Sequence, residues 1–240
     1  MEAEIKKHAK NIYKAAKGTQ YKIFEKIKDI CVEIVVIVIA VSISIALHNW
    51  NENRHNRQEE KEFLLGLQKD LHGDIENMES SRMFYEESVQ GMTYFLSIAG
   101  KPALLSKDSV NKYLGIFFSS TDLDPHIERY EGLKSSGKFT IIENNELLNN
   151  IINLHEVIIQ RIHILNNKYY THQERLETII SQNIQMSTSV TNIPLLLRRS
   201  DILLSLRVGK GIIANNIVPI HTSGIKACNN IIAQIDEQLK

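Results

Sequence analysis

The chain has 240 residues, with 28 basic and 28 acidic side chains and 43% hydrophobic residues. This length suits one domain of ordinary size beside an apolar segment. The charge is uneven, because residues 1–30 carry a net +4 and the remainder −4. The acidic remainder argues against nucleic acid as a partner. Two cysteines, Cys31 and Cys228, are too few for a disulfide framework.

Residues 1–29 form a basic N-terminal segment. Residues 1–30 contain eight lysines and only four acidic residues. Positive charge next to an apolar segment marks the cytoplasmic side of a membrane protein, so we expect residues 1–29 in the cytoplasm. Contact with anionic lipid headgroups is the alternative reason for the lysines.

Residues 30–50 are predicted to form a transmembrane helix. Within them, residues 34–47 (IVVIVIAVSISIAL) contain no charge and only two hydroxyl groups. The 21 residues from Ile30 to Trp50 give about 31 Å of helix, which matches the hydrocarbon core of a bilayer. Trp50 suits the aromatic belt at a membrane interface.

The distribution of lysine and arginine predicts the orientation of this span. Residues 48–68 contain three basic and four acidic residues. The positive-inside rule therefore places residues 51–240, a helical soluble domain, on the outer (periplasmic) side of a bacterial inner membrane. A cleaved signal peptide is the alternative, since Ser44-Ile45-Ala46 is a small-x-small site, but the long basic segment before the span is atypical of one.

Glu33 is the candidate functional residue of the span. Carboxylates inside a bilayer are costly and often functional. The alternative is an interfacial residue that pairs with Lys26 or Lys28. The sequence leaves both interpretations open.

Small residues in the span indicate close contact between helices. Ala40 and Ser44, and likewise Ser42 and Ala46, have small-xxx-small spacing. This spacing lets two helix backbones approach closely. We therefore expect self-association or contact with another membrane protein, besides contact with the lipid bilayer.

After the span, a helical pattern continues to about Ala99. Hydrophobic residues step by threes and fours, as in a coiled coil, and Arg82 is the polar member of the seam. Gly66, Gly73 and Gly91 fall off the seam, where we expect them only to weaken the helix. The first seam comprises Leu64, Leu67, Leu71, Ile75, Met78, Arg82, Tyr85, Val89, Met92 and Leu96.

Two short helices and a turn are predicted next. Ser106 is a suitable N-cap for a helix through Phe118. Asp124-Pro125 is expected to begin a second helix, through about Leu133. Ser135–Gly137 is predicted to be a turn.

A second long seam starts near Asn145 and includes His155 and His172. We interpret both histidines as residues that set register or fill the core, in preference to a pH-sensitive or metal-binding pair. Seventeen residues apart, or about 25 Å along one helix, they cannot share a metal ion. The second seam comprises Leu148, Ile151, His155, Ile158, Ile162, Leu165, Tyr169, His172, Leu176 and Ile179.

The C-terminal part is also predicted to be helical. A polar connection from Ser187 to Pro194 leads to a helix or helix pair over residues 200–239, which Gly209, Gly211 and Pro219 are expected to break or kink. The chain shows no alternating pattern typical of a sheet. The predicted fold class is all-α, with the transmembrane helix continuing into an elongated antiparallel helical bundle.

Two motifs with possible chemistry fail on their sequence context. Gly132–Lys138 resembles a phosphate-binding loop, but Phe139 stands where the loop needs Ser or Thr, and no apolar strand precedes it. His155-Glu156 suggests a zinc protease, but Ile159 stands where the second histidine is required. We interpret both as ordinary structural segments.

One acidic loop offers a weak pattern for a cation. Asp122, Asp124 and His126 supply three possible ligands within five residues, although Asp before Pro is ordinary helix-start chemistry. The sequence therefore assigns no catalytic residue, no metal site and no cofactor, and we do not expect an enzyme.

Four segments resemble a bacterial membrane-protein family known only as a domain of unknown function. These are Glu33–Ala40, His48–Glu52 (HNWNE), Tyr130–Gly137 (YEGLKSSG) and Ile141–Leu147 (IIENNEL). Members of that family are similar in having one N-terminal span headed Glu-Ile and closed by Asn-Trp-Asn-Glu, then a helical region. The resemblance implies a single-span topology and implies no catalytic residue.

Three functions fit these observations. The first is a membrane-anchored scaffold or sensor that acts through helical association. The second is a membrane effector whose spans oligomerise into a pore, with Glu33 lining or gating it. The third, which has the least support, is a hydrolase in the helical domain that uses His155 or His172.

Overall fold

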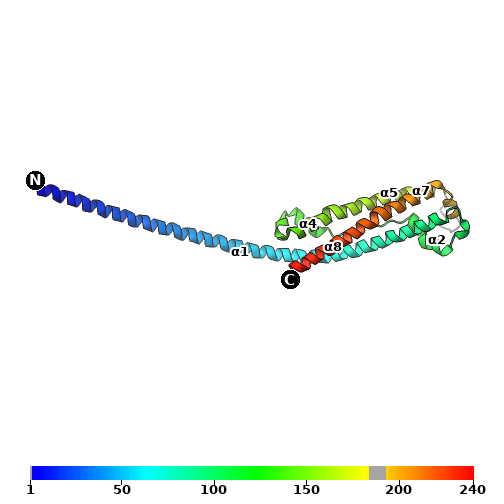
Figure 1. The fold of residues 1–240 in the computed structure, drawn as a ribbon, viewed down its shortest axis with the longest axis horizontal. Helices are drawn as coiled ribbons and strands as arrows, with labels where there is room; N and C mark the ends of the chain where they lie inside the picture. The colour runs from blue at the N-terminus through cyan, green and yellow to red at the C-terminus, as the bar shows by residue number, and fades with distance from the viewer. Residues whose placement is uncertain (1, 184–192) are drawn as a thin grey trace. The chain divides into compact units, whose positions relative to one another are not determined.

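A computed structural model describes residues 2–183 and 193–240, and every element within these ranges is a helix or helical turn (Figure 1). This confirms the predicted all-α class. The first helix, α1, runs from Glu2 to Ile98, so the predicted end near Ala99 is also confirmed. The chain divides into two compact units, Met1–Gln58 and Glu59–Lys240, and α1 contributes to both.

The second unit contains all the elements after α1. The predicted polar connection from Ser187 falls largely on residues 184–192, which lie outside the described ranges. The elements are η1 (Pro102–Leu104), α2 (Lys107–Tyr113), η2 (Leu114–Phe117), α3 (Glu128–Ser135), η3 (Lys138–Ile141), α4 (Asn145–Asn153), η4 (Leu154–Ile159), α5 (Gln160–Asn183), α6 (Ile193–Leu196), α7 (Ser200–Ile212), η6 (Ile213–Ile217) and α8 (Val218–Gln238).

Within the second unit, α1 runs parallel to the helix formed by α4, η4 and α5. The Glu60 carboxylate on α1 accepts a hydrogen bond from the Glu143 N–H, just before α4, at 2.9 Å. Further along both helices, the rings of Tyr85 and Tyr169 lie 5.7 Å apart. The prediction that the long helices are antiparallel is therefore wrong for this pair. Residues 99–144, which we call the returning segment, lead the chain back to the end of the bundle at which α1 enters it, and the second long helix starts there.

The predicted antiparallel arrangement is found for the helices α7 and α8, which run opposite to α1 and α5. Gln238, at the end of α8, donates to Glu60 at 2.7 Å, and His221, near the start of α8, lies 5.8 Å from the Tyr85 ring. Figure 1 shows α7 and α8 leading back along α5 toward the end of the bundle that holds the C-terminus. The bundle thus combines two parallel helical segments with one antiparallel return.

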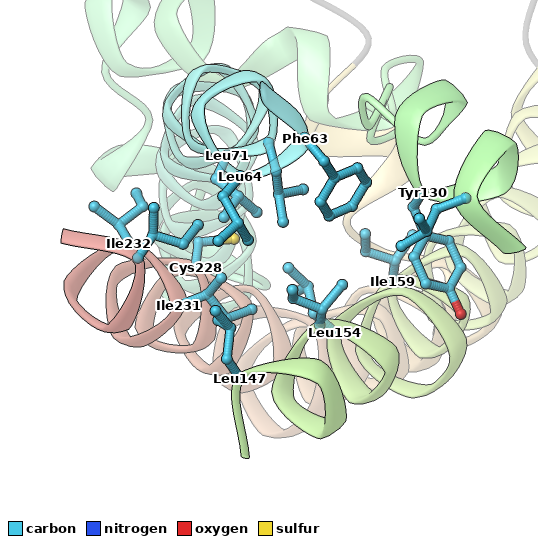
Figure 2. Packing of buried hydrophobic residues seen from close by; sticks show 14 of the residues in the cluster. Phe63, Leu64, Leu71, Tyr130, Leu147, Leu154, Ile159, Cys228, Ile231 and Ile232 are labelled. Atoms are coloured by element: carbon cyan, nitrogen blue, oxygen red, sulfur yellow. The ribbon is translucent and has the colours of Figure 1, made fainter. Parts of the chain in front are cut away.

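Two clusters of buried apolar side chains form the core. The first joins α1, α4, η4 and α8 (Figure 2), and its sulfur-bearing Cys228 is fully buried. The second joins the far end of α1 with η2, α5 and α7. Among the largest side chains buried to below 2% exposure are Tyr85, Tyr130, Tyr169, Phe95, Phe117, Leu64, Leu67 and Leu71.

Glycines on α1 let the returning segment lie against the helix. A β-carbon at Gly73 would come within 2.8 Å of the His126 ring, and one at Gly66 would overlap the Arg129 guanidinium. Arg129 in turn donates to Asp70 on α1 at 2.7 Å. These glycines therefore do more than weaken the helix, because their missing side chains make room for residues 126–129.

Asp74 holds this returning segment to α1. Its Oδ1 accepts the backbone N–H of His126 at 2.9 Å and lies 2.8 Å from Nδ1 of the same residue, and the Asp74 side chain is fully buried. With the His126 N–H bonded to Asp74, the backbone turns away from helical geometry here. Consequently α3 begins at Glu128, not at the predicted Asp124-Pro125.

A π-helical turn, η4, interrupts the second seam. The turn adds one residue to the helical repeat, so the consecutive residues Leu154 and His155 are both buried. The register then shifts: Ile159 is buried where the seam predicts Ile158, which is only half-buried. The even steps of three and four expected from the sequence are therefore wrong around this turn.

The C-terminal helices meet at another π-helical turn. α7 continues through Gly209 and Gly211, where a break was expected, and η6 follows before α8. Pro219 lies in the first turn of α8, where its missing N–H is tolerated. The interruption thus lies just before the predicted proline, and the glycines leave the helix intact.

We predict that Asp74→Ala destabilises the bundle. The substitution leaves the His126 backbone N–H without its acceptor, which costs on the order of 2 kcal/mol. Chemical unfolding of the full chain in detergent, followed by circular dichroism, measures this loss. Asp124→Ala is the matched control, because it removes an exposed carboxylate from the loop that contains His126, and equal stabilities of the two variants would contradict the prediction.

Candidate functional site

The most unusual surface of the described chain is a row of exposed apolar residues on α1. The large aliphatic side chains from Val32 to Leu47 are each 52–60% exposed, and Trp50 is 64% exposed. Among the described residues, this is the one helical stretch long and apolar enough to cross a membrane. A helix whose whole circumference is apolar is suited to lipid or to burial inside a larger protein.

Glu33 lies within this row and is exposed. Of its two predicted partners, Lys28 has an exposed side chain, and the side chain of Lys26 lies outside those described. Whether Glu33 lines a pore or lies at a membrane interface stays a prediction.

The small residues of the span form two separate faces. Because an α-helix has 3.6 residues per turn, Ala40 and Ser44 share one face, and Ser42 and Ala46 lie on the nearly opposite face. The Ser44 hydroxyl donates to the Ala40 carbonyl at 2.9 Å. Its hydrogen-bonding capacity is thus used within the helix, and the Ala40–Ser44 face is left narrow and without a free donor.

Arg82 does not lie in the core, where the first seam places it. Its side chain is 33% exposed and donates to Glu86, one helical turn later, at 3.1 Å. The preceding residue, Ser81, is buried instead. On this part of α1, Met78, Tyr85 and Met92 are buried as the seam predicts, and the other buried positions lie one residue before the seam.

His155 is buried as predicted. It is 4% exposed, and its ring stacks on Tyr130 with centroids 4.2 Å apart and planes within 7°. Neither ring nitrogen has a hydrogen-bond partner among the described residues. Burial lowers the pKa of His155 to about 4, so this imidazole is neutral at physiological pH.

His172 is half-buried between α5 and α7. Its Nε2 lies 3.0 Å from the Ser205 carbonyl and 3.1 Å from the Ser205 hydroxyl. Burial lowers the pKa of His172, and the bond to Ser205 opposes that shift. A β-carbon at Gly209 would lie 3.1 Å from the same Nε2, so the glycine permits this contact between helices.

The core contains polar residues that the seams do not reveal. Three of them, Asp74, Ser81 and Ser88 on α1, stand one position before a seam residue and are spaced seven positions apart. That heptad of short polar side chains was the signal available in the sequence. The buried polar residues outside the seams are Glu60, Asp74, Ser81, Ser88, Asn166, Gln173 and His221.

The loop with Asp122, Asp124 and His126 does not gather its three possible ligands. His126 turns to Asp74, whereas Asp122 turns to Asn166 on α5, whose amide donates to it at 3.1 Å. Within the described ranges, no group of three or more His, Cys, Asp or Glu side chains is placed to hold a metal ion.

The glycine-rich segment Gly132–Lys138 spans the end of α3, a turn and the start of η3. Gly137 adopts a left-handed conformation with φ of 69°, which glycine tolerates best. Lys138 pairs with Glu59 on α1. The segment thus closes a turn against α1, which agrees with a structural interpretation.

The fold and this surface define an all-helical protein with one apolar, exposed helical stretch near its N-terminus. The chain belongs to the family of unknown function DUF6090, whose sequence profile matches residues 33–202. The match covers all but the first residue of the apolar row and most of the bundle, which confirms the resemblance to a domain of unknown function. No curated protein matches the chain, and no solved structure does.

We predict that His155 makes stability depend on acid. Because its folded pKa is depressed, its contribution is fully present above the unfolded value of 6.5 and is lost as pH falls toward about 4. His155→Phe keeps the stack on Tyr130 and removes the titration. Between pH 6.5 and about pH 4, its free energy of unfolding should therefore fall by about 2–3 kcal/mol less than that of the wild type.

Unfolding midpoints of the full chain across this pH range measure the difference. His72→Phe is the control, because it replaces an exposed histidine on α1 and should keep the pH dependence of the wild type. If the unfolding midpoint of His155→Phe fell with decreasing pH as steeply as that of the wild type, the buried imidazole would not resist protonation, and the prediction would be contradicted.

Proposed function

We propose that this protein is a single-span membrane protein that acts through helical association, as a membrane-anchored scaffold or sensor. The observation that carries the proposal is the exposed apolar row on α1, with side chains from Val32 to Leu47 at 52–60% exposure. In water, that surface would stay unburied at a large cost in free energy, and a bilayer provides the apolar environment that it lacks.

The charge pattern supports an orientation. Residues 1–30 contain eight lysines, which favours a cytoplasmic N-terminus in a bacterial inner membrane by the positive-inside rule. The bundle, Glu59–Lys240, then works on the outer (periplasmic) side. Its polar residues at the surface and its apolar clusters within suit an aqueous compartment.

Association is supported by the span itself. Ala40 and Ser44 are small residues one helical turn apart, and the Ser44 hydroxyl is bonded to the Ala40 carbonyl. A second copy of the helix, or the span of another membrane protein, can approach such a face closely enough for extensive van der Waals contact. The proposal thus assigns the span a role in assembly in addition to anchoring.

We predict that Ile39→Lys combined with Ile43→Lys releases the protein from membranes. Each lysine at the centre of a span costs about 2.5–3.5 kcal/mol in insertion free energy. The fraction resistant to alkaline extraction should fall strongly. Leu65→Lys with Met83→Lys is the control, because both residues are exposed on the bundle part of α1. A wild-type protein that alkali extracts completely would contradict the anchor.

We also predict that Ala40→Leu combined with Ser44→Leu weakens association. The two larger side chains keep the helices apart and cost about 1 kcal/mol, so cross-linked dimers in native membranes should fall about fivefold. Ser42→Leu with Ala46→Leu makes the same exchange on the opposite small face and shows whether that face also takes part. Equal cross-linking in wild type and both double variants would contradict the proposed face.

A further inference from the structure

A groove opens between the loop before α3 and the exposed side of α5. It has a volume of about 660 Å³ and is lined by residues of the segment 120–122 and of α5 from His163 to Tyr170. This volume lies within the range of about 300–1,000 Å³ that is typical of small-molecule sites. The groove lies in the second unit, remote in sequence from the apolar row.

A positioned carboxylate stands in this groove. Asp122 Oδ1 accepts its neighbouring Leu123 N–H at 2.8 Å and the Asn166 amide at 3.1 Å. Nδ1 of His163 lies 3.5 Å from the same oxygen. These contacts hold the carboxylate in place, although its side chain remains 71% exposed to solvent.

Asn166 is the buried polar group at the base of the groove. The residue is 3% exposed, and it lines the groove although it belongs to the core. Its Nδ2 donates to Asp122, and its Oδ1 has no hydrogen-bond partner among the described residues. The contribution of Asn166 to the groove is therefore its Nδ2 group, which holds the Asp122 carboxylate in place.

The charge of the groove is negative. None of the residues that line it is Lys or Arg. The field of Asp122 also extends into the core: burial is the main cause of the raised pKa of Tyr85, and the Asp122 charge raises it further. A positively charged ligand therefore suits this groove better than an anion does.

The other wall of the groove is apolar. Ile164 is 66% exposed and Tyr170 is 50% exposed, and both line it. Large apolar side chains beside a fixed carboxylate match the hydrocarbon part and the charged end of one ligand, and a tyrosine ring also attracts cations.

We propose that this groove binds a small organic cation, namely a primary ammonium carried on a short apolar or aromatic body. The ammonium donates to the Asp122 carboxylate, which Asn166 holds in place, and the body packs against Ile164 and Tyr170. A bare metal ion is disfavoured, because no group of three or more His, Cys, Asp or Glu ligands gathers in the described part of the chain. The proposal is independent of the membrane function and goes beyond it.

The test is calorimetric titration of the full chain in detergent micelles with 2-phenylethylammonium, and with 2-phenylethanol as its neutral counterpart. We expect saturable binding of the ammonium, at least tenfold tighter than that of the alcohol. Asp122→Asn should weaken it about tenfold, because the charge-assisted hydrogen bond is lost. Asp124→Asn, which removes a nearby carboxylate outside the groove, should bind as wild type does.

A second variant protects the test against misfolding. Ile164→Lys changes a residue that is 66% exposed, so the fold tolerates it, and the added ammonium should abolish binding. Circular dichroism establishes that each variant is folded. Three results would overturn the proposal: no saturable binding to folded wild type, equal affinities for ammonium and alcohol, or unchanged affinity in both groove variants.

Discussion

The bundle depends on one contact, in which the fully buried Asp74 carboxylate on α1 accepts the His126 backbone N–H and meets the half-exposed His126 ring. The contact fixes the point at which the segment after α1 crosses back along the helix. Because that segment returns the chain to its starting end, the second long helix can run parallel to α1. Without such a return, two consecutive long helices joined by a short connection would lie antiparallel.

The same contact explains why a glycine stands in the middle of α1, next to Asp74. Gly73 precedes Asp74, and a β-carbon there would meet the His126 ring. A glycine in mid-helix costs about 1 kcal/mol relative to alanine. That cost is offset by a charge-assisted hydrogen bond to a fully buried carboxylate. Local propensity is thus overridden by tertiary contact.

Sequence periodicity predicted the existence and type of the long helices, because apolar residues must repeat every three to four positions to bury one face. It did not predict which neighbouring residue lies innermost. Arg82 lies on the seam and yet is partly exposed, whereas Ser81 is buried. Arg82 reaches the carboxylate of Glu86 on its own helix. A π-helical turn such as η4 shifts the register by one residue with no sequence signal of its own. The groove at Asp122 was equally hidden, because it joins residues more than 40 positions apart.

The strongest constraint that the sequence imposes concerns the environment of the apolar row on α1. Burying a Val or Ile side chain stabilises by about 1.5–3 kcal/mol, and the row from Val32 to Leu47 leaves these side chains more than half exposed. Summed over the row, the unrealised stabilisation is on the order of 10 kcal/mol, comparable with the whole stability of a typical domain. In the bundle, by contrast, even polar residues such as Asn166 are buried. A chain that buries amides in one unit and exposes a continuous row of isoleucine and valine in the other needs an apolar environment around that row, and the bilayer of the proposed function provides one.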